Sequence, residues 1–144
     1  MKISKTFIND LLIIEPELFK DERGFFYESY NKNNFDNVIN LVFVQENESK
    51  SYKGVVRGLH FQIKNQQTKL LHVVEGKIID VAINLKKNSP NFGKVSKFIL
   101  NDGDMLFIPK HYGHGYECLS NKCTVLYHLE KYRDARYESG INYS

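Results

Sequence analysis

The feature that most limits the fold of this sequence is a succession of short apolar, β-branched and aromatic runs separated by turn residues. Ten such runs follow one another without long helical patterns between them, which argues against an α/β fold. The predicted strands are Leu11–Ile14, Gly24–Tyr30, Val42–Glu46, Gly54–Gln62, Lys69–Val74, Lys77–Leu85, Val95–Leu100, Met105–Ile108, Gly113–Cys118 and Cys123–Leu129. This pattern predicts an all-β sandwich or barrel.

The size and composition of the chain agree with one globular β domain spanning residues 1–144. Ten Phe and nine Tyr stand against only three Pro, a balance typical of aromatic-rich strands. One short helix is predicted over Asn33–Ile39, because Phe35, Val38 and Ile39 fall on a single helical face. The β-rich runs on either side of Glu75-Gly76 predict a tight hairpin.

The charge pattern points to a small anionic ligand. The net charge is +3 and the positive residues are scattered, so we expect no nucleic-acid partner, although a nucleotide diphosphate would suit a mildly basic protein. No apolar run is long enough to cross a membrane and no signal peptide is recognisable, so we expect a cytoplasmic protein without membrane association. The two cysteines, Cys118 and Cys123, are expected to be free, packed thiols.

Two histidine segments carry the outline of cupin motifs. In Gly54–Gln62 five residues separate a glycine from His60, and in Gly103–His114 a glycine, a proline and then His114 appear in that order. Metal-binding cupins continue the first motif with a second histidine and a nearby glutamate, but Gln62 stands at the second position here. Two imidazoles and an amide make a poor site for a divalent transition metal, so no metal is expected.

Polar residues on strands expected to be central suggest a cavity. On Lys77–Leu85 strand alternation groups Asp80 and Asn84 on one face, which lines either a polar cavity or solvent. Burying such groups without a ligand would be costly. The polar set comprises Arg57, His60, Gln62, Lys69, Asp80 and Tyr127. Ideal alternation places Arg57 and His60 on opposite faces, so both reach one site only if the strand bulges or twists, most plausibly at Gly58.

Eight stretches in the same order resemble the dTDP-4-dehydrorhamnose 3,5-epimerase family of nucleotide-sugar epimerases. They are FKDERGFFYESYN (19–31), FVQENESKS (43–51), GVVRGLHFQ (54–62), TKLLHVVEGKIIDVAINL (68–85), NSPNFGK (88–94), MLFIP (105–109), GHGY (113–116) and VLY (125–127). The resemblance implies a cupin-type jelly-roll barrel, no cofactor, and a homodimer formed by exchange of N-terminal strands. Met1–Ile14, an apolar strand at the terminus, suits such pairing.

The resemblance also implies catalytic roles. His60 takes the place of the base that removes a proton beside the 4-keto group, and Tyr127 that of the acid that returns a proton from the opposite face. Lys69 matches the position that stabilises the enolate oxygen, which fits the need for a cation there. The implied substrate-binding residues are Phe19, Arg23, Glu28, Gln45, Asn47, Arg57, His114 and Tyr132. Of these, Arg23 and Arg57 suit a diphosphate because a guanidinium can form two parallel hydrogen bonds.

The carboxylate partner of His60 is the open point of the resemblance. Family members usually continue beyond Ser144, and an aspartate in that continuation pairs with the catalytic histidine. Asp80 could take the place of this aspartate, or the protein could be a truncated or decayed gene product. A third alternative is that the protein catalyses only the epimerisation at C3. We therefore expect epimerisation at C3, C5 or both of a nucleotide-linked 4-keto-6-deoxyhexose. The alternatives are a catalytically impaired nucleotide-sugar binding protein and a 3,4-ketoisomerase.

Overall fold

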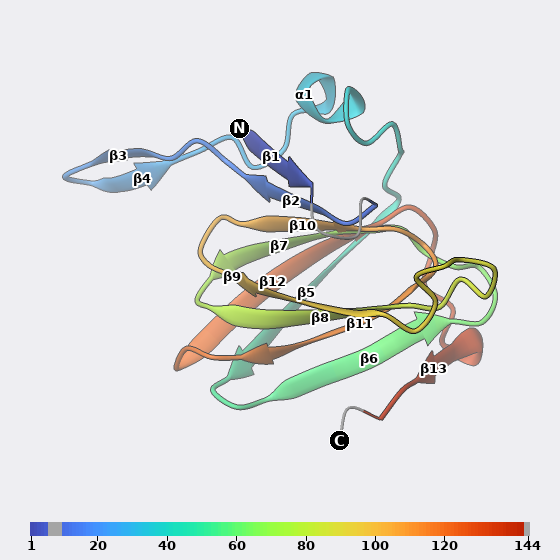
Figure 1. The fold of residues 1–144 in the computed structure, drawn as a ribbon. Helices are drawn as coiled ribbons and strands as arrows, with labels where there is room; N and C mark the ends of the chain where they lie inside the picture. Colours follow the sequence, from blue (N-terminus) through green and yellow to red (C-terminus); the bar gives the residue numbers. More distant parts are fainter. Residues whose placement is uncertain (6–9, 143–144) are drawn as a thin grey trace.

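Two antiparallel sheets face each other and enclose most of the apolar side chains (Figure 1). The computed structural model describes residues 1–5 and 10–142. The first sheet has the strand order β1 (Lys2–Lys5), β2 (Leu12–Glu15), β10 (Met105–Ile108), β7 (Lys69–Glu75), β12 (Lys122–Leu129) and β5 (Gln45–Tyr52). The second has the order β13 (Glu138–Gly140), β6 (Val56–Gln62), β11 (Tyr112–Cys118), β8 (Ile78–Asn84) and β9 (Val95–Leu100). The predicted all-β, cupin-like architecture is confirmed.

Strand alternation explains the main core. In β8 the residues Ile78, Asp80, Ala82 and Asn84 are buried, whereas the residues between them are partly exposed. The polar face of this strand therefore points into the barrel, as the cavity interpretation requires. The core between the sheets contains Leu11, Leu71, Val73, Ile78, Ala82, Leu100, Leu106, Ile108, Tyr112, Tyr116, Cys118, Cys123 and Val125. Both cysteines are free and buried, as expected.

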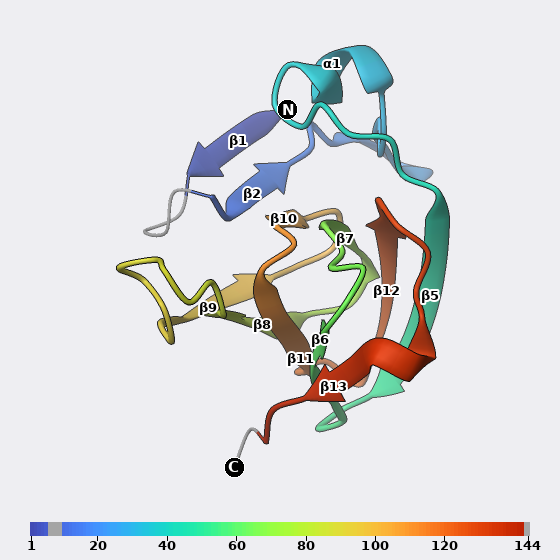
Figure 2. The same ribbon diagram turned by 90° about the vertical axis from the view of Figure 1, so that its right-hand side faces the viewer.

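The N-terminal part of the chain covers the outer face of the first sheet. Phe35 of helix α1 (Lys32–Asp36) and Ile39 pack with Ile14, Leu70 and Met105 in a second apolar cluster. Strand β7 is therefore buried on both faces over much of its length, because one face meets the core and the other meets this cover. Figure 2 shows α1 on the side of the molecule where β1 and β2 form one edge of the first sheet.

A two-stranded hairpin projects away from the barrel. It consists of β3 (Phe19–Asp21) and β4 (Gly24–Phe26), and Figure 1 shows it extending past the edge of both sheets. Three aromatic side chains of this hairpin are exposed, with Phe26 at 71%. Tyr27 attaches its base to the first sheet, since its Oη lies 2.6 Å from Nε2 of His72.

Several predicted boundaries are wrong. Residues Val42–Val44 do not form the strand expected there; β5 begins at Gln45 and runs through polar residues to Tyr52, because only alternate side chains meet the core. The helix ends at Asp36, and Val38 is exposed rather than on the buried face. The terminal segment is not a lone strand, since β1 pairs with β2 in register Ile3↔Ile14.

Two short strands, β3 and β13, escaped the sequence prediction, and a one-turn 3-10 helix, η1 (Ala135–Tyr137), precedes the second of them. No helix in the described ranges is long and apolar enough to cross a membrane.

Candidate active site

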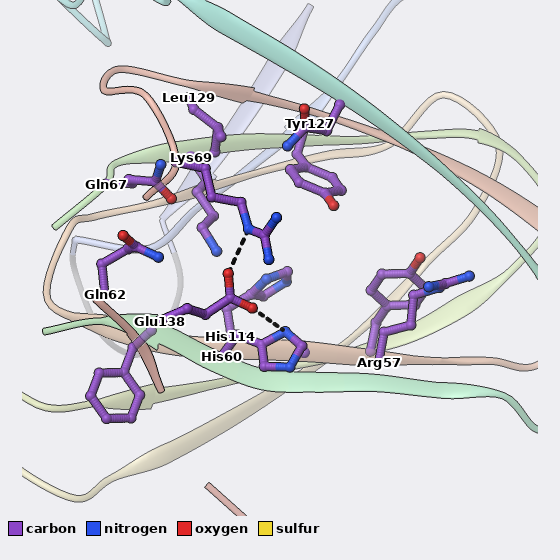
Figure 3. Close-up of a pocket in the computed structure, with 14 residues that line it drawn as sticks. Arg57, His60, Gln62, Gln67, Lys69, His114, Tyr127, Leu129 and Glu138 are labelled. Carbon is purple, nitrogen blue, oxygen red and sulfur yellow. Dashed lines mark hydrogen bonds and ion pairs between the residues drawn. The ribbon is translucent and has the colours of Figure 1, made fainter. Parts of the chain in front are cut away.

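A polar cavity of about 290 Å³ lies between the two sheets (Figure 3). Its walls come from β6, β11 and β13 on one side and from β7, β12 and β5 on the other. The lining residues are Asn47, Arg57, His60, Phe61, Gln62, Gln67, Lys69, His114, Gly115, Tyr116, Tyr127, Leu129, Arg133 and Glu138. The volume lies near the lower end of the range for small-molecule sites, about 300–1,000 Å³.

An irregularity in β6 brings Arg57 and His60 to the same cavity. His114 of the neighbouring strand β11 pairs with His60, whereas Tyr116 of β11 pairs with Arg57. The register of β6 against β11 therefore shifts by one residue between these two pairs. Gly58 lies in this shift with φ of +101°, and a Cβ there would meet the carbonyl oxygen of His114 at 2.6 Å. Only glycine fits such a close backbone approach. The expected bulge at Gly58 is therefore present.

Arg57 is held at one end of the cavity. Its Nε donates a hydrogen bond to Oγ of Ser51 at 2.8 Å, and one terminal nitrogen donates to the carbonyl oxygen of Lys50 at 3.0 Å. Both acceptors belong to β5 of the opposite sheet. The guanidinium therefore bridges the two walls, and its remaining donors are positioned for an anionic ligand.

Tyr127 and Lys69 stand on the wall opposite His60, on neighbouring strands. In the register of β12 and β7, Leu129 faces Lys69 and Tyr127 faces Leu71, so the side chains of Tyr127 and Lys69 share the inner face. Figure 3 shows both side chains directed into the space that His60 enters from the other wall. Burial raises the pKa of Tyr127, and burial lowers the pKa of Lys69 while Glu138 and Asp80 oppose that shift.

Asp80 pairs with His114, not with His60. Its Oδ2 lies 2.6 Å from Nε2 of His114, and the carboxylate is completely buried in the barrel. The other oxygen, Oδ1, has no hydrogen-bond partner within the described part of the chain. The idea that Asp80 substitutes as the partner of His60 is therefore corrected, because β8 places it behind the neighbouring histidine.

The carboxylate that faces His60 is that of Glu138. Its Oε1 lies 3.8 Å from Nδ1 of His60, and its Oε2 accepts a hydrogen bond from Nε of Arg133 at 2.5 Å (Figure 3). Neither Glu138 nor Arg133 was predicted as a site residue. Arg133 precedes the 3-10 turn and Glu138 begins the three-residue strand β13, which is too short to show strand periodicity, so the sequence gives no local signal that would bring them to the cavity.

The predicted substrate-binding residues fall into three groups. Asn47, Arg57 and His114 line the cavity. Gln45 and Tyr132 lie beside the lining; the side-chain oxygen of Gln45 accepts a hydrogen bond from the Arg133 backbone at 3.0 Å, and Tyr132 is 70% exposed. The third group stands on or next to the projecting hairpin, outside the described lining of the cavity, and comprises Phe19, Arg23 and Glu28.

The donor set of this site does not suggest a metal centre. Gln62, which stands where metal-binding cupins have a histidine, is buried and accepts a hydrogen bond from the Asp134 backbone at 3.4 Å. Over residues 1–5 and 10–142 no group of three or more His, Cys, Asp and Glu side chains is arranged to hold a metal ion. The side-chain amide of Gln62 is instead used to attach the segment that follows β12 to β6.

Comparison with known proteins identifies close relatives. The family model described as dTDP-4-dehydrorhamnose 3,5-epimerase matches residues 5–144. The enzyme of that name from Methanothermobacter thermautotrophicus is 44% identical over 140 residues, covering 95% of this chain and 76% of the relative. The one from Salmonella typhimurium is 43% identical over 146 residues, covering 98% of this chain and 80% of the relative.

Solved structures of the same family share the fold. The dTDP-6-deoxy-D-glucose-3,5-epimerase of Legionella pneumophila, in complex with dTDP-4-keto-L-rhamnose, superimposes with a TM-score of 0.94 at 40% identity, covering 99% of this chain and 78% of that one. The dTDP-4-dehydrorhamnose 3,5-epimerase of Bacillus anthracis, with TDP and PPi bound, gives 0.93 at 39% identity, covering 99% and 84%. The sequence resemblance is thereby confirmed, and the chain belongs to the dTDP-4-dehydrorhamnose 3,5-epimerase family.

Proposed function

We propose that this protein epimerises C3, C5 or both of a dTDP-linked 4-keto-6-deoxyhexose, without a metal or cofactor. The observation that carries the proposal is that His60 and Tyr127 enter one cavity from opposite walls, with Lys69 on the same wall as Tyr127 and lining the same cavity. Family membership supports the substrate class, because relatives are named for this reaction and one is solved with dTDP-4-keto-L-rhamnose.

The chemistry follows from the acidity of a C–H bond beside a ketone. In our proposal His60 removes that proton, the electron pair moves into an enolate, and the negative charge collects on the former keto oxygen. Lys69 is the cation nearest to this role, and a preorganised cation lowers the barrier to enolate formation. Tyr127 then donates a proton to the opposite face of the same carbon, which inverts its configuration. Burial keeps its phenol protonated at neutral pH, because it raises the pKa.

Hydrogen exchange with solvent tests this proposal directly. The protein is incubated with dTDP-4-keto-6-deoxyglucose in D₂O, and the sugar is analysed by mass spectrometry and NMR. Deuterium at C3, C5 or both, with inverted configuration, is the expected result. Folded protein that binds the nucleotide sugar but incorporates no deuterium would contradict it and favour a binding protein. A product whose carbonyl has moved to C3 would identify a 3,4-ketoisomerase instead.

We further propose that two copies of the chain form the functional unit. The cavity of one chain is small for a whole nucleotide sugar, while Phe19 and Arg23 stand on a hairpin that extends away from it. Exposed aromatic side chains and an arginine suit a nucleotide base and a diphosphate. The hairpin of one copy would therefore complete the cavity of the other. Strand β1, an edge of the first sheet, offers a further surface for pairing between copies.

Mixed dimers test the exchange of hairpins. Light scattering is expected to give twice the 16.8 kDa mass of one chain. His60→Asn chains, which lack the base, and Arg23→Glu chains, which bind substrate weakly, are then mixed, refolded together and assayed for deuterium uptake at a substrate concentration well below the KM of the Arg23→Glu protein. Activity should return, because one site of the mixed dimer combines an intact His60 with the intact Arg23 of the other chain. A 16.8 kDa species, or no recovery in a demonstrated mixed dimer, would contradict the proposal.

A further inference from the structure

Strand β13 brings a carboxylate to the rear of the His60 imidazole. In its pairing with β6, Gly140 faces His60 and Glu138 faces Gln62, so Glu138 is the diagonal neighbour of His60 on the same face. Gly140 has no side chain to fill the space opposite the ring; a Cβ there would lie 3.8 Å from Cδ2 of His60. Gly140 thus presents no side chain to the imidazole, and the Glu138 side chain reaches it from two residues away.

The two carboxylate oxygens of Glu138 have different partners. Arg133 donates to Oε2 at 2.5 Å, which fixes the rotation of the carboxylate, and Oε1 is directed at Nδ1 of His60 at 3.8 Å. The hydrogen bond from Arg133 lowers the pKa of Glu138, and the positive charges of Arg133, His60 and Lys69 act in the same direction, against desolvation. Glu138 is therefore an anion at neutral pH.

The segment that carries Arg133 and Glu138 is attached to both walls of the cavity. The side-chain oxygen of Gln45 on β5 accepts from the Arg133 backbone, and that of Gln62 on β6 accepts from the Asp134 backbone. At its start Asp134 caps the 3-10 turn that leads into β13. The position of the carboxylate is consequently fixed relative to the strand that carries His60.

We propose that Glu138 is a positioning residue for the proposed base: its carboxylate orients His60 with the proton on Nδ1, so that Nε2 presents a lone pair to the substrate. This inference rests on the proposed function of His60. A neutral imidazole accepts a proton only at its unprotonated nitrogen, so the tautomer decides whether the cavity contains a base. An anion beside Nδ1 also stabilises the imidazolium formed when Nε2 takes the proton.

Nitrogen-15 NMR of the histidine side chains reads the tautomer without any substrate. For wild-type protein with its histidines in the neutral form we expect the proton of His60 on Nδ1. In Glu138→Gln the ratio of Nδ1–H to Nε2–H should fall at least about threefold, and deuterium exchange should lose about tenfold to hundredfold in kcat with little change in KM. Glu138→Asp should restore part of both. Glu48→Gln, which removes an exposed glutamate from β5 outside the cavity lining, is the matched control.

The Arg133→Gln variant distinguishes a positioning role of Glu138 from a purely structural role of the Glu138–Arg133 ion pair. This variant keeps the Glu138 carboxylate but no longer fixes its rotation, so a part of the Nδ1–H preference should persist. An unchanged tautomer ratio in folded Glu138→Gln, or an equal loss in Arg133→Gln, would overturn the inference. If the tautomer responds as expected but wild-type protein exchanges no deuterium, the positioning role holds and the proposed epimerase activity fails.

Discussion

The cavity and the β3–β4 hairpin carry the same kinds of functional side chain but differ in how they are supported. In the cavity every wall strand is paired on at least one side within the chain, and Arg57, His114 and Glu138 each have a partner that fixes them. On the hairpin Arg23 forms, among residues 1–5 and 10–142, an ion pair only with its local neighbour Asp21, and Phe19 is 57% exposed. The cavity is therefore preorganised in one chain, whereas the hairpin offers groups that need a surface to act on.

This difference predicts two kinds of defect. Changes in the cavity should reduce the rate of the chemical step, because its groups are fixed before substrate arrives. Changes on the hairpin should weaken substrate binding, since its groups would stabilise the bound substrate and the transition state to the same extent.

The largest effect is expected for His60→Asn. Loss of a positioned general base should lower the rate of deuterium exchange by about 10²–10⁴-fold, with the circular dichroism spectrum and the melting temperature nearly unchanged, because His60 is at the exposed mouth of the cavity. His111→Asn, at a histidine outside the cavity lining, serves as the control. A His60→Asn protein that exchanges at the wild-type rate would remove His60 from the mechanism.

Lys69→Met should have the next largest effect on catalysis. Removing one donor to a developing oxyanion typically costs about 10²–10³-fold in kcat. We expect this loss in single-turnover deuterium exchange, while the affinity for dTDP measured by calorimetry stays within about twofold, because Lys69 lies in the part of the cavity assigned to the sugar. A large loss of dTDP affinity with unchanged kcat would instead place Lys69 in nucleotide binding.

The free energy of unfolding should depend on pH through His72, the histidine that Tyr27 contacts at the base of the hairpin. Burial, followed by the nearby His128, lowers the pKa of His72 from 6.5 to about 4. Between pH 4 and pH 6.5 the unfolded chain binds a proton on His72 that the folded protein does not bind. The contribution of His72 to the free energy of unfolding is therefore fully present above about pH 6.5 and is lost as the pH falls to 4. The expected loss is about 3 kcal/mol in the free energy of unfolding.

Urea unfolding of wild-type protein and His72→Gln at several pH values between 7.5 and 4 measures this contribution. The difference between the two proteins should narrow by most of that amount as the pH falls, since glutamine does not titrate. Parallel curves for the two proteins would show that His72 is not the responsible group.

The smallest effect is expected on the hairpin. Arg23→Ala should raise KM for the nucleotide sugar about tenfold and leave kcat within about threefold, since a charge-assisted hydrogen bond to a phosphate is lost while the cavity stays intact. Lys20→Ala, on the same hairpin, controls for the loss of a positive charge. A fall in kcat equal to that of Lys69→Met would break the distinction between the two regions.

The two regions were also predicted from the sequence with different success. The strands from β7 to β12 combine β-rich composition with turn signals, so the sequence predicts them within one or two residues of their observed bounds. The need for a bulge at Gly58 followed from simple alternation, because a strand cannot present residues three positions apart on one face without it. His60, Lys69 and Tyr127 were thus brought together correctly.

Local patterns failed where distant contacts decide the structure. The polar strand β5 owes its conformation to pairing with β12 along its whole length, which nothing in its own composition reveals. Glu138 reaches His60 only because a three-residue strand adds to the edge of β6. Asp80 was placed correctly on the inner face, but alternation alone could not decide which of two adjacent histidines it would meet.

The bulge at Gly58 has a consequence for redesigning specificity. It shifts the alternation of β6, so that an odd-numbered residue before it, Arg57, and even-numbered residues after it, His60 and Gln62, all line the cavity. A mutagenesis library that assumed regular alternation along the whole of β6 would randomise residues that do not face the cavity on one side of the bulge. Restoring regular spacing by replacing this glycine would turn one of the two side chains out of the barrel, so the phase of the strand is itself a determinant of which sugars can be handled.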